Sequence, residues 1–333
     1  MGGPNRILLA LALAASCAAA ASAEPVKLRI GWIVPASDSP FLMFKTEGIA
    51  KHAGTSYTLE FLHFQSTPLM VTALAAGELD MAELSYPAIA TAISQGAVSD
   101  LRVIADTIQD GVDGWYATEY FVLKDGPIKS VEDLRGKVYA TNAIGAAPDI
   151  AFRAMLRKHK LQAKDVTIIE AAFPNMKAML ADHKADIAMT PQPFSKDPAL
   201  RAMATTLFTM KDAVGTTQLI TLNSRAAFLA KNRAAVVDYL EDELRALHWF
   251  SDPANHDAAV KIIADFTKTP VALWDGWLFT HGDDYRDPNG HPNLQALQAN
   301  IDTEYDAGFL KTKVGVAQYA DLSLVDEAAK RLK

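Results

Sequence analysis

The residues of this chain best suited to chemistry are its eight histidines and its acidic side chains. No two histidines have the spacing of a zinc-protease helix, and no Gly-x-Ser-x-Gly turn is present to expose a nucleophilic serine. The densest group of possible metal ligands lies in a Gly-, Pro- and Asn-rich segment, where solvated polar turns are ordinary, and comprises His281, Asp283, Asp284, Asp287 and His291. We therefore expect no catalytic residue, no metal site and no cofactor.

A second charged run, Glu241 to Glu243, lies within a predicted helix. Arg245 follows Glu241 by four residues, the spacing at which opposite charges pair along a helix. We expect this run to form a solvated helix face.

Composition narrows the class of protein further. The chain has 333 residues, a net charge of −7 and one cysteine, Cys17. A mildly acidic chain without a basic stripe does not bind nucleic acid, because phosphate binding needs clustered lysine and arginine. The length suits two domains, and the absence of cysteine after residue 17 excludes disulfides and thiol chemistry there.

The first 23 residues are typical of a secretory signal peptide. Arg6 precedes a short apolar run, and Ala21-Ser22-Ala23 forms a small-residue cleavage site before Glu24. The alternative is a lipoprotein, in which Cys17 would carry the anchor. We expect cleavage after residue 23 and a periplasmic protein, with lipidation as the less favoured reading.

The chain contains one unit twice, at an offset of 106 residues. Seven positions of the first copy have an identical residue in the second: Pro68, Met70, Leu74, Ala75, Asp80, Ala82 and Pro87. In each copy a strand leads into a helix that starts with proline, and a short strand and another proline follow.

Strands that alternate with helices of 10–15 residues indicate parallel βαβ units. We therefore predict an α/β fold of two duplicated, Rossmann-like lobes with mainly parallel sheets, joined by two crossing strands. Lobe one takes residues 24–118 and 223–333, and lobe two takes 119–222. The crossings are expected at 119–123 and 217–222. C-terminal helices at 234–250, 255–267 and 322–332 should pack on lobe one.

A ligand of such a fold binds at the carboxyl ends of the strands, where helix N-termini point. Six loops meet that rule: 34–41, 65–68, 84–87, 141–148, 172–174 and 190–194. Free N–H groups at helix starts attract anions, whereas Glu83, if it faces the cleft, favours a cation or a hydrogen-bond donor. Trp32 and Phe41 are expected to supply an apolar wall.

Four stretches resemble a known family: residues 28–32 (LRIGW), 73–80 (ALAAGELD), 128–137 (IKSVEDLRGK) and 165–167 (DVT). The chain resembles, over about residues 26–225, the periplasmic solute-binding proteins of nitrate/sulfonate/taurine ABC uptake systems, which are related to binders of thiamine-pyrimidine precursors. The resemblance implies a type II periplasmic-binding-protein fold, a small-molecule ligand and an ABC permease as partner, with the protein acting as a monomer.

The family's ligand-binding loops map onto particular positions here. Together with Trp32, the expected ligand-binding residues are Ser39, Phe41, Gln65, Ser66, Ser85, Tyr86, Asn142, Gly145, Ala146, Pro191, Gln192 and Phe194. The family commonly has Gly-Ser where this chain has Gly145-Ala146, which weakens a sulfonate or nitrate assignment. The enzymatic, cysteine-dependent branch of the fold is not supported, since residues 24–333 contain no cysteine.

The sequence therefore predicts an extracytoplasmic solute-binding protein that serves an ABC importer. The expected ligand is a small organic anion, such as a sulfonate or carboxylate, or a pyrimidine-like heterocycle. The alternatives are a periplasmic sensory module not coupled to transport and, less favoured, an exported enzyme.

Overall fold

The computed structural model describes residues 24–35 and 39–333. The predicted signal peptide, residues 1–23, and Cys17 within it lie outside this part. The strands are β1 (Val26–Trp32), β2 (Tyr57–His63), β3 (Met81–Ser85), β4 (Leu101–Asp110), β5 (Glu119–Leu123), β6 (Val138–Thr141), β7 (Thr167–Glu170), β8 (Ile187–Thr190), β9 (Ala204–Thr209) and β10 (Thr217–Arg225).

The α-helices are α1 (Thr67–Ala75), α2 (Tyr86–Ser94), α3 (Ala147–Lys158), α4 (Met176–Ala181), α5 (Pro198–Met203), α6 (Met210–Val214), α7 (Ala226–Ser251), α8 (His256–Thr267), α9 (Leu294–Asp306) and α10 (Ser323–Arg331). Short 3-10 helices are η1 (Ser39–Lys45), η2 (Val131–Leu134), η3 (Ala163–Asp165), η4 (Phe173–Asn175), η5 (Phe194–Lys196), η6 (Pro253–Asn255), η7 (Val271–Leu273) and η8 (Val316–Tyr319).

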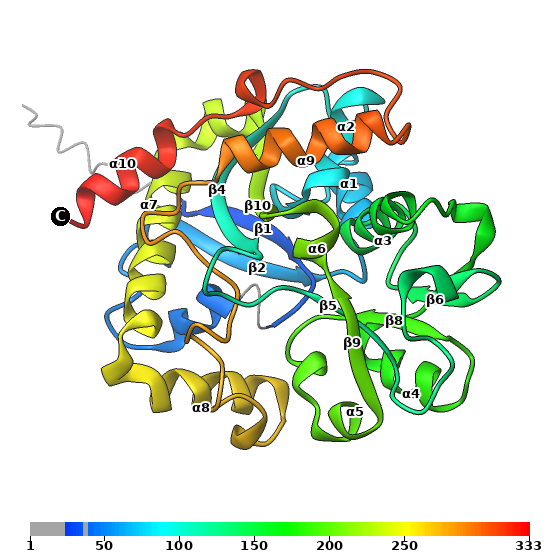
Figure 1. Cartoon of the computed structure of the whole chain (residues 1–333). Helices are drawn as coiled ribbons and strands as arrows, with labels where there is room; N and C mark the ends of the chain where they lie inside the picture. The colour runs from blue at the N-terminus through cyan, green and yellow to red at the C-terminus, as the bar shows by residue number, and fades with distance from the viewer. Residues whose placement is uncertain (1–23, 36–38) are drawn as a thin grey trace, which may run out of the picture.

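The strands form two five-stranded sheets of the same topology, ordered β2-β1-β3-β10-β4 and β7-β6-β8-β5-β9 (Figure 1). Within each sheet the first three strands in this order pair in parallel, and one strand, β10 or β5, runs antiparallel to both of its neighbours. The predicted fold class, two α/β lobes with mainly parallel sheets, is confirmed.

The sequence repeat has a structural counterpart in the two sheets. The Asp80 amide donates to the Arg29 carbonyl on β1, and the Asp80 carboxylate accepts the Arg29 amide at 2.9 Å. Asp186, 106 residues later, does the same with Val138 on β6, whose amide lies 2.9 Å from its carboxylate. An identical residue thus fixes the register of the equivalent strand in each lobe.

The chain crosses between the lobes twice, once just before β5 and once just before β10. Residues 111–118 lead from β4 of the first sheet to β5 of the second, and residues 215–216 lead from α6 to β10. β10 pairs with β3 and β4 along its length, starting from Thr217 opposite Asp110. The expected lobe boundary at residue 222 therefore falls inside a strand of the first sheet.

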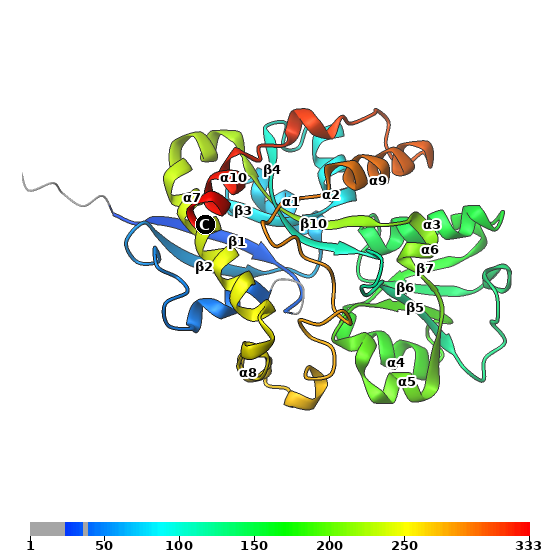
Figure 2. The ribbon, with the colours of Figure 1, turned by 60° about the vertical axis from the view of Figure 1, so that its left-hand side comes forward.

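The C-terminal helices cover the first sheet, as predicted. Helices α7, α8 and α10 pack with η1 on one face, whereas α1, α2 and α9 cover the other. The second sheet lies between α3 with α6 and α4 with α5. Figure 2 shows the long α7 and α10 on the outer side of the first lobe, away from the second. Within the described residues, no helix combines the length and apolarity needed to span a bilayer.

One expectation about solvation on α7 proves wrong. The run Glu241 to Glu243 on α7 is not a solvated face, because Glu241 and Asp242 are 8% and 0% exposed. Arg245 does pair with Glu241, as expected, but it also pairs with Asp242. The reason is tertiary: residues 49–57 and α10 cover this side of α7, so the charges are neutralised inside the protein.

A buried glutamate makes stability depend on pH. Glu304 on α9 is 2% exposed, and burial raises its pKa to about 8. Its folded pKa lies above the unfolded value, so the folded state binds the extra proton and stability falls as pH rises from about 5 to about 8.

We expect Glu304→Gln to remove that loss, making the variant about 2–4 kcal/mol more stable than the wild type near pH 8 and equal to it near pH 4. Urea unfolding at several pH values measures this difference. The exposed Glu47→Gln is the control, and parallel pH profiles for Glu304→Gln and the wild type would contradict the prediction.

Candidate functional site

A cavity of about 80 Å³ lies between the two lobes. The first lobe contributes the residues that follow β1, the start of α1, the end of β3 and parts of β4 and β10. The second contributes the residues that follow β6, the starts of α3, η4 and α6, and the end of β8 with the residue after it. The lining residues are Ile33, Val34, Thr67, Glu83, Ser85, Ile108, Thr118, Asn142, Ala146, Ala147, Pro148, Phe173, Met189, Pro191, Met210, Leu219, Ile220 and Asp284.

Four of the thirteen residues expected to bind a ligand line this cavity: Ser85, Asn142, Ala146 and Pro191. The Ser85 and Thr67 hydroxyls are 2.8 Å apart. Asn142 Nδ2 donates across the cleft to the Gln65 carbonyl at 3.4 Å, so its Oδ1 is not used in that bond. That oxygen has no hydrogen-bond partner among the described residues.

The aromatic wall expected from Trp32 and Phe41 lies elsewhere. Their rings pack 5.3 Å apart inside the core of the first lobe, with Phe61 and Phe266 beside them. The apolar lining comes instead from Ile33 and Val34, one and two residues after Trp32, together with residues of the second lobe.

The other expected residues surround the cavity without lining it. Tyr86 is buried at the start of α2, Ser66 precedes α1, and Gly145 donates its amide to Asp149. Phe194 starts η5, and Ser39 starts η1, although its side chain is outside what the structure describes. Gln192 instead donates from Nε2 to the Gly282 carbonyl at 2.6 Å.

The helix start nearest the cavity is already occupied by a negative charge. Ala146, Ala147 and Pro148 line the cavity at the start of α3. Asp149, 1% exposed, accepts the Gly145 amide at 2.9 Å and pairs with Arg153. A carboxylate at this position uses the amide that an anionic ligand would need.

Two acidic side chains line the cavity, Glu83 from β3 and Asp284 from the C-terminal part of the chain. They are 5% and 6% exposed. Burial raises the pKa of Asp284 well above its usual range, and the nearby Asp283 and Asp110 act in the same direction. Of residues 24–35 and 39–333, no lysine, arginine or histidine lines the cavity.

Asp284 belongs to a segment that we name the strap, residues 270–292, which runs between the lobes (Figure 2). Tyr285 exchanges two backbone bonds with Gln109 at the end of β4, and the Asp283 carbonyl accepts the Tyr116 amide. Gly282 accepts the bond from Gln192 of the second lobe. The strap is thereby attached to the first lobe, to the crossing and to the second lobe.

The acid-rich strap is not the solvated turn that its composition predicts. Asp283 is fully buried and pairs with Arg286 at 3.0 Å, while His281 stacks on Trp115 with ring centroids 4.5 Å apart. Only Asp283 and Asp284 of the five predicted residues are buried, whereas His281 is exposed and Asp287 and His291 are half-buried. Sequence reasoning missed Asp284 as a lining residue, and only its place in a charged cluster could have drawn attention to it.

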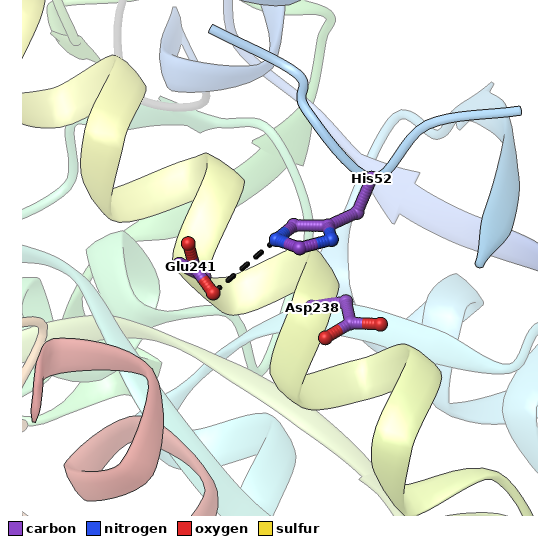
Figure 3. A group of neighbouring side chains, drawn as sticks. All are labelled: His52, Asp238 and Glu241. Atoms are coloured by element: carbon purple, nitrogen blue, oxygen red, sulfur yellow. Dashed lines mark ion pairs between the residues drawn. The ribbon is translucent and has the colours of Figure 1, made fainter. Parts of the chain in front are cut away.

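Figure 3 shows another group of possible metal ligands, His52, Asp238 and Glu241, on the outer side of α7. His52 Nε2 lies 3.2 Å from Glu241. Both carboxylates also contact arginines: Asp238 pairs with Arg331 at 2.7 Å, and Glu241 pairs with Arg245. These positive charges make the group an ion-pair network, which leaves little negative charge to hold a metal ion. A second group, His256, Asp257 and Asp275, is largely exposed.

A family model described as the NMT1-like family matches residues 21–264. The chain belongs to the NMT1-like family. Membership confirms the family resemblance drawn from the sequence. The matched range includes both sheets and every lining residue of the cavity except Asp284.

Solved structures share the fold of this NMT1-like chain. The alkanesulfonate-binding protein SsuA from Xanthomonas axonopodis pv. citri, bound to MOPS, is 20% identical, with a TM-score of 0.72, over 90% of this chain and 99% of that one. The periplasmic nitrate-binding protein NrtA from Synechocystis PCC 6803 is 17% identical, with a TM-score of 0.73, over 93% and 90%.

The desulfurization enzyme DSZB is 14% identical, with a TM-score of 0.66, over 92% of this chain and 100% of that one. The fold therefore carries both binding proteins and an enzyme, and the likeness by itself does not decide between them. A comparison with curated protein sequences found no match.

Proposed function

We propose that this NMT1-like protein is the extracytoplasmic solute-binding component of an ABC importer. It captures a small molecule between its lobes and delivers it to a permease in the inner membrane. The observation that carries the proposal is the cavity enclosed by both lobes at the carboxyl ends of their strands, where α/β folds bind ligands. The signal-peptide pattern at residues 1–23 supports a periplasmic location.

Binding would act by shifting an equilibrium between open and closed lobes. In the present arrangement the lobes touch through Asn142 and the Gln65 carbonyl, and through the Tyr116 hydroxyl and Ser195 at 3.0 Å. A ligand that contacts both lobes stabilises this arrangement. Residues 111–118 and 215–216 would be the hinge, since they are the two connections between the sheets.

The sequence is compatible with two classes of ligand, a small organic anion and a pyrimidine-like heterocycle. The cavity lining supports the second class, because Asn142 and Asp284 offer acceptors and no basic side chain lines it among the described residues. Sulfonates and carboxylates would meet like charges there. An uncharged or donor-bearing heterocycle fits both the apolar walls and the polar groups.

A thermal-shift screen of the purified, ligand-stripped protein tests the proposal. The panel holds alkanesulfonates, taurine, nitrate, urea, hydroxymethylpyrimidine, and aromatic and aliphatic carboxylates. A compound present at about 1,000 times its Kd adds about 4 kcal/mol of stability, and therefore raises Tm by several degrees. A hit whose uptake is lost on deletion of the gene supports transport. A hit with unchanged uptake would favour the sensory alternative.

A further inference from the structure

The polar groups of the interlobe cavity form an unusual set, because most of them accept hydrogen bonds and few donate. Asp284 Oδ1 and Asn142 Oδ1 have no partner within the described part of the chain, and both side chains are at least nine-tenths buried. Both residues line the cavity, as does Glu83, which has an interaction of its own elsewhere. Buried acceptors without donors are costly, so a ligand that fills the cavity must bring donors.

Two basic side chains, Arg286 and Lys196, lie near Asp284, and each also contacts another group. Arg286, the nearest on the strap, is held by Asp283 at 3.0 Å. Lys196 of η5 lies over the Tyr116 ring, 4.7 Å from its centroid. Asp110 on β4 adds a further negative charge, and its own carboxylate accepts the Thr118 amide at 2.6 Å. The charge balance at the cavity wall is therefore negative.

We propose that the cavity selects a solute with a positively charged nitrogen group that carries N–H donors, and that Asp284 contacts that group. This inference rests on the proposed function and names the chemical class of its ligand. The remainder of the solute is apolar, since Ile33, Val34 and Phe173 are among the side chains of the opposing walls. Asn142 Oδ1 accepts one of the N–H groups.

The strap positions Asp284 at the cavity from outside the range 21–264 that the family model matches. Because the strap is bound to both lobes, the carboxylate is held in place before a ligand arrives. A pre-positioned charge selects among ligands of equal shape by their charge.

Two isosteric series test the charge directly: acetamidinium, acetamide and acetate, and benzamidinium, benzamide and benzoate. Within each series the shape is nearly constant and the charge runs from positive to negative. We expect Tm of the purified protein to rise with at least one amidinium at about 10 mM and to stay unchanged with both carboxylates. Isothermal titration then gives the Kd of each binder.

The variant Asp284→Asn keeps the shape of the side chain and removes its charge. We expect it to weaken amidinium binding by about 10- to 100-fold and amide binding by less than about threefold. Asparagine matches the size of aspartate and carries no charge in a buried site, so the variant should fold. The exposed Asp182→Asn, which lies on the second lobe, is the matched control and should bind as the wild type does.

Proton release gives a second readout. A bound cation favours the ionised form of Asp284, so amidinium affinity should increase with pH. The other ionisable groups near Asp284 are Glu83, Asp110, Asp283, Arg286 and Lys196. Asp284→Asn should flatten that dependence.

Binding of a carboxylate, or an amidinium affinity unchanged in Asp284→Asn, would overturn the inference and leave solute capture intact. The inference would also be overturned, with solute capture intact, if neither amidinium binds but an uncharged or anionic compound of the thermal-shift panel does. Failure of every compound in both sets would count against the proposed function as well.

Discussion

Replacing Ala146 with leucine should abolish ligand binding while leaving the fold intact. Ala146 is 3% exposed, precedes α3 with an extended backbone, and lines the cavity of about 80 Å³. Leucine adds three carbon atoms to this space and would clash with either the ligand or the opposite lobe. We expect affinity for the best compound of the thermal-shift panel to fall about 100-fold or more.

Isothermal titration of Ala146→Leu measures this loss, and Tm without ligand reports on the fold. Ala258→Leu is a matched control, because residue 258 is exposed on α8 and far along the chain from the cavity residues. Affinity within about threefold of the wild type in Ala146→Leu would show that ligands bind elsewhere.

Replacing Asp242 with alanine should lower the free energy of unfolding by about 3–5 kcal/mol. Asp242 is fully buried on α7, where its carboxylate accepts the Lys51 amide at 3.0 Å, the His52 amide at 2.9 Å and the Tyr57 hydroxyl at 2.7 Å. It also pairs with Arg245. Alanine would leave these three donors without their acceptor and would leave Arg245 with Glu241 as its remaining carboxylate partner.

Urea unfolding measures the effect of Asp242→Ala, and the exposed Asp257→Ala on α8 is its control. Ligand affinity of the folded protein should be unchanged, since Asp242 does not line the cavity. A loss below about 1 kcal/mol would mean that water replaces the carboxylate at this site.

The strands and the duplication could be predicted because their signals are local. Alternating or continuous apolar runs and helix-starting prolines recur in both halves, and each strand expected from them is present. Helix α9 was not predicted. Its buried face includes Asn300 and Glu304 beside Leu297 and Ile301, so polar residues interrupt the apolar stripe that marks a helix in a sequence.

The site could be predicted as a set of loops, and the side chains that line it could not. β3 is buried on both faces, so its pattern does not show that Glu83 and Ser85, two residues apart, line the cavity. Ile108 of β4 and Ile220 of β10 are paired neighbours, and both line the cavity. Their place there depends on where the chain crosses between the lobes. Asp284 lies in a long loop, and the spacing of apolar residues in a sequence does not predict where such a loop runs.

The strap has a consequence for the entropy of closure. Two free lobes joined by two connections lose rotational freedom when they close, and ligand contacts must compensate for that loss. Here Gly282 and Asp283 bind to Gln192 and Tyr116, which ties the second lobe and the crossing to the C-terminal part of the first. This third attachment narrows the range of lobe orientations before any ligand binds. A larger share of the contact energy of a small solute is then retained as affinity.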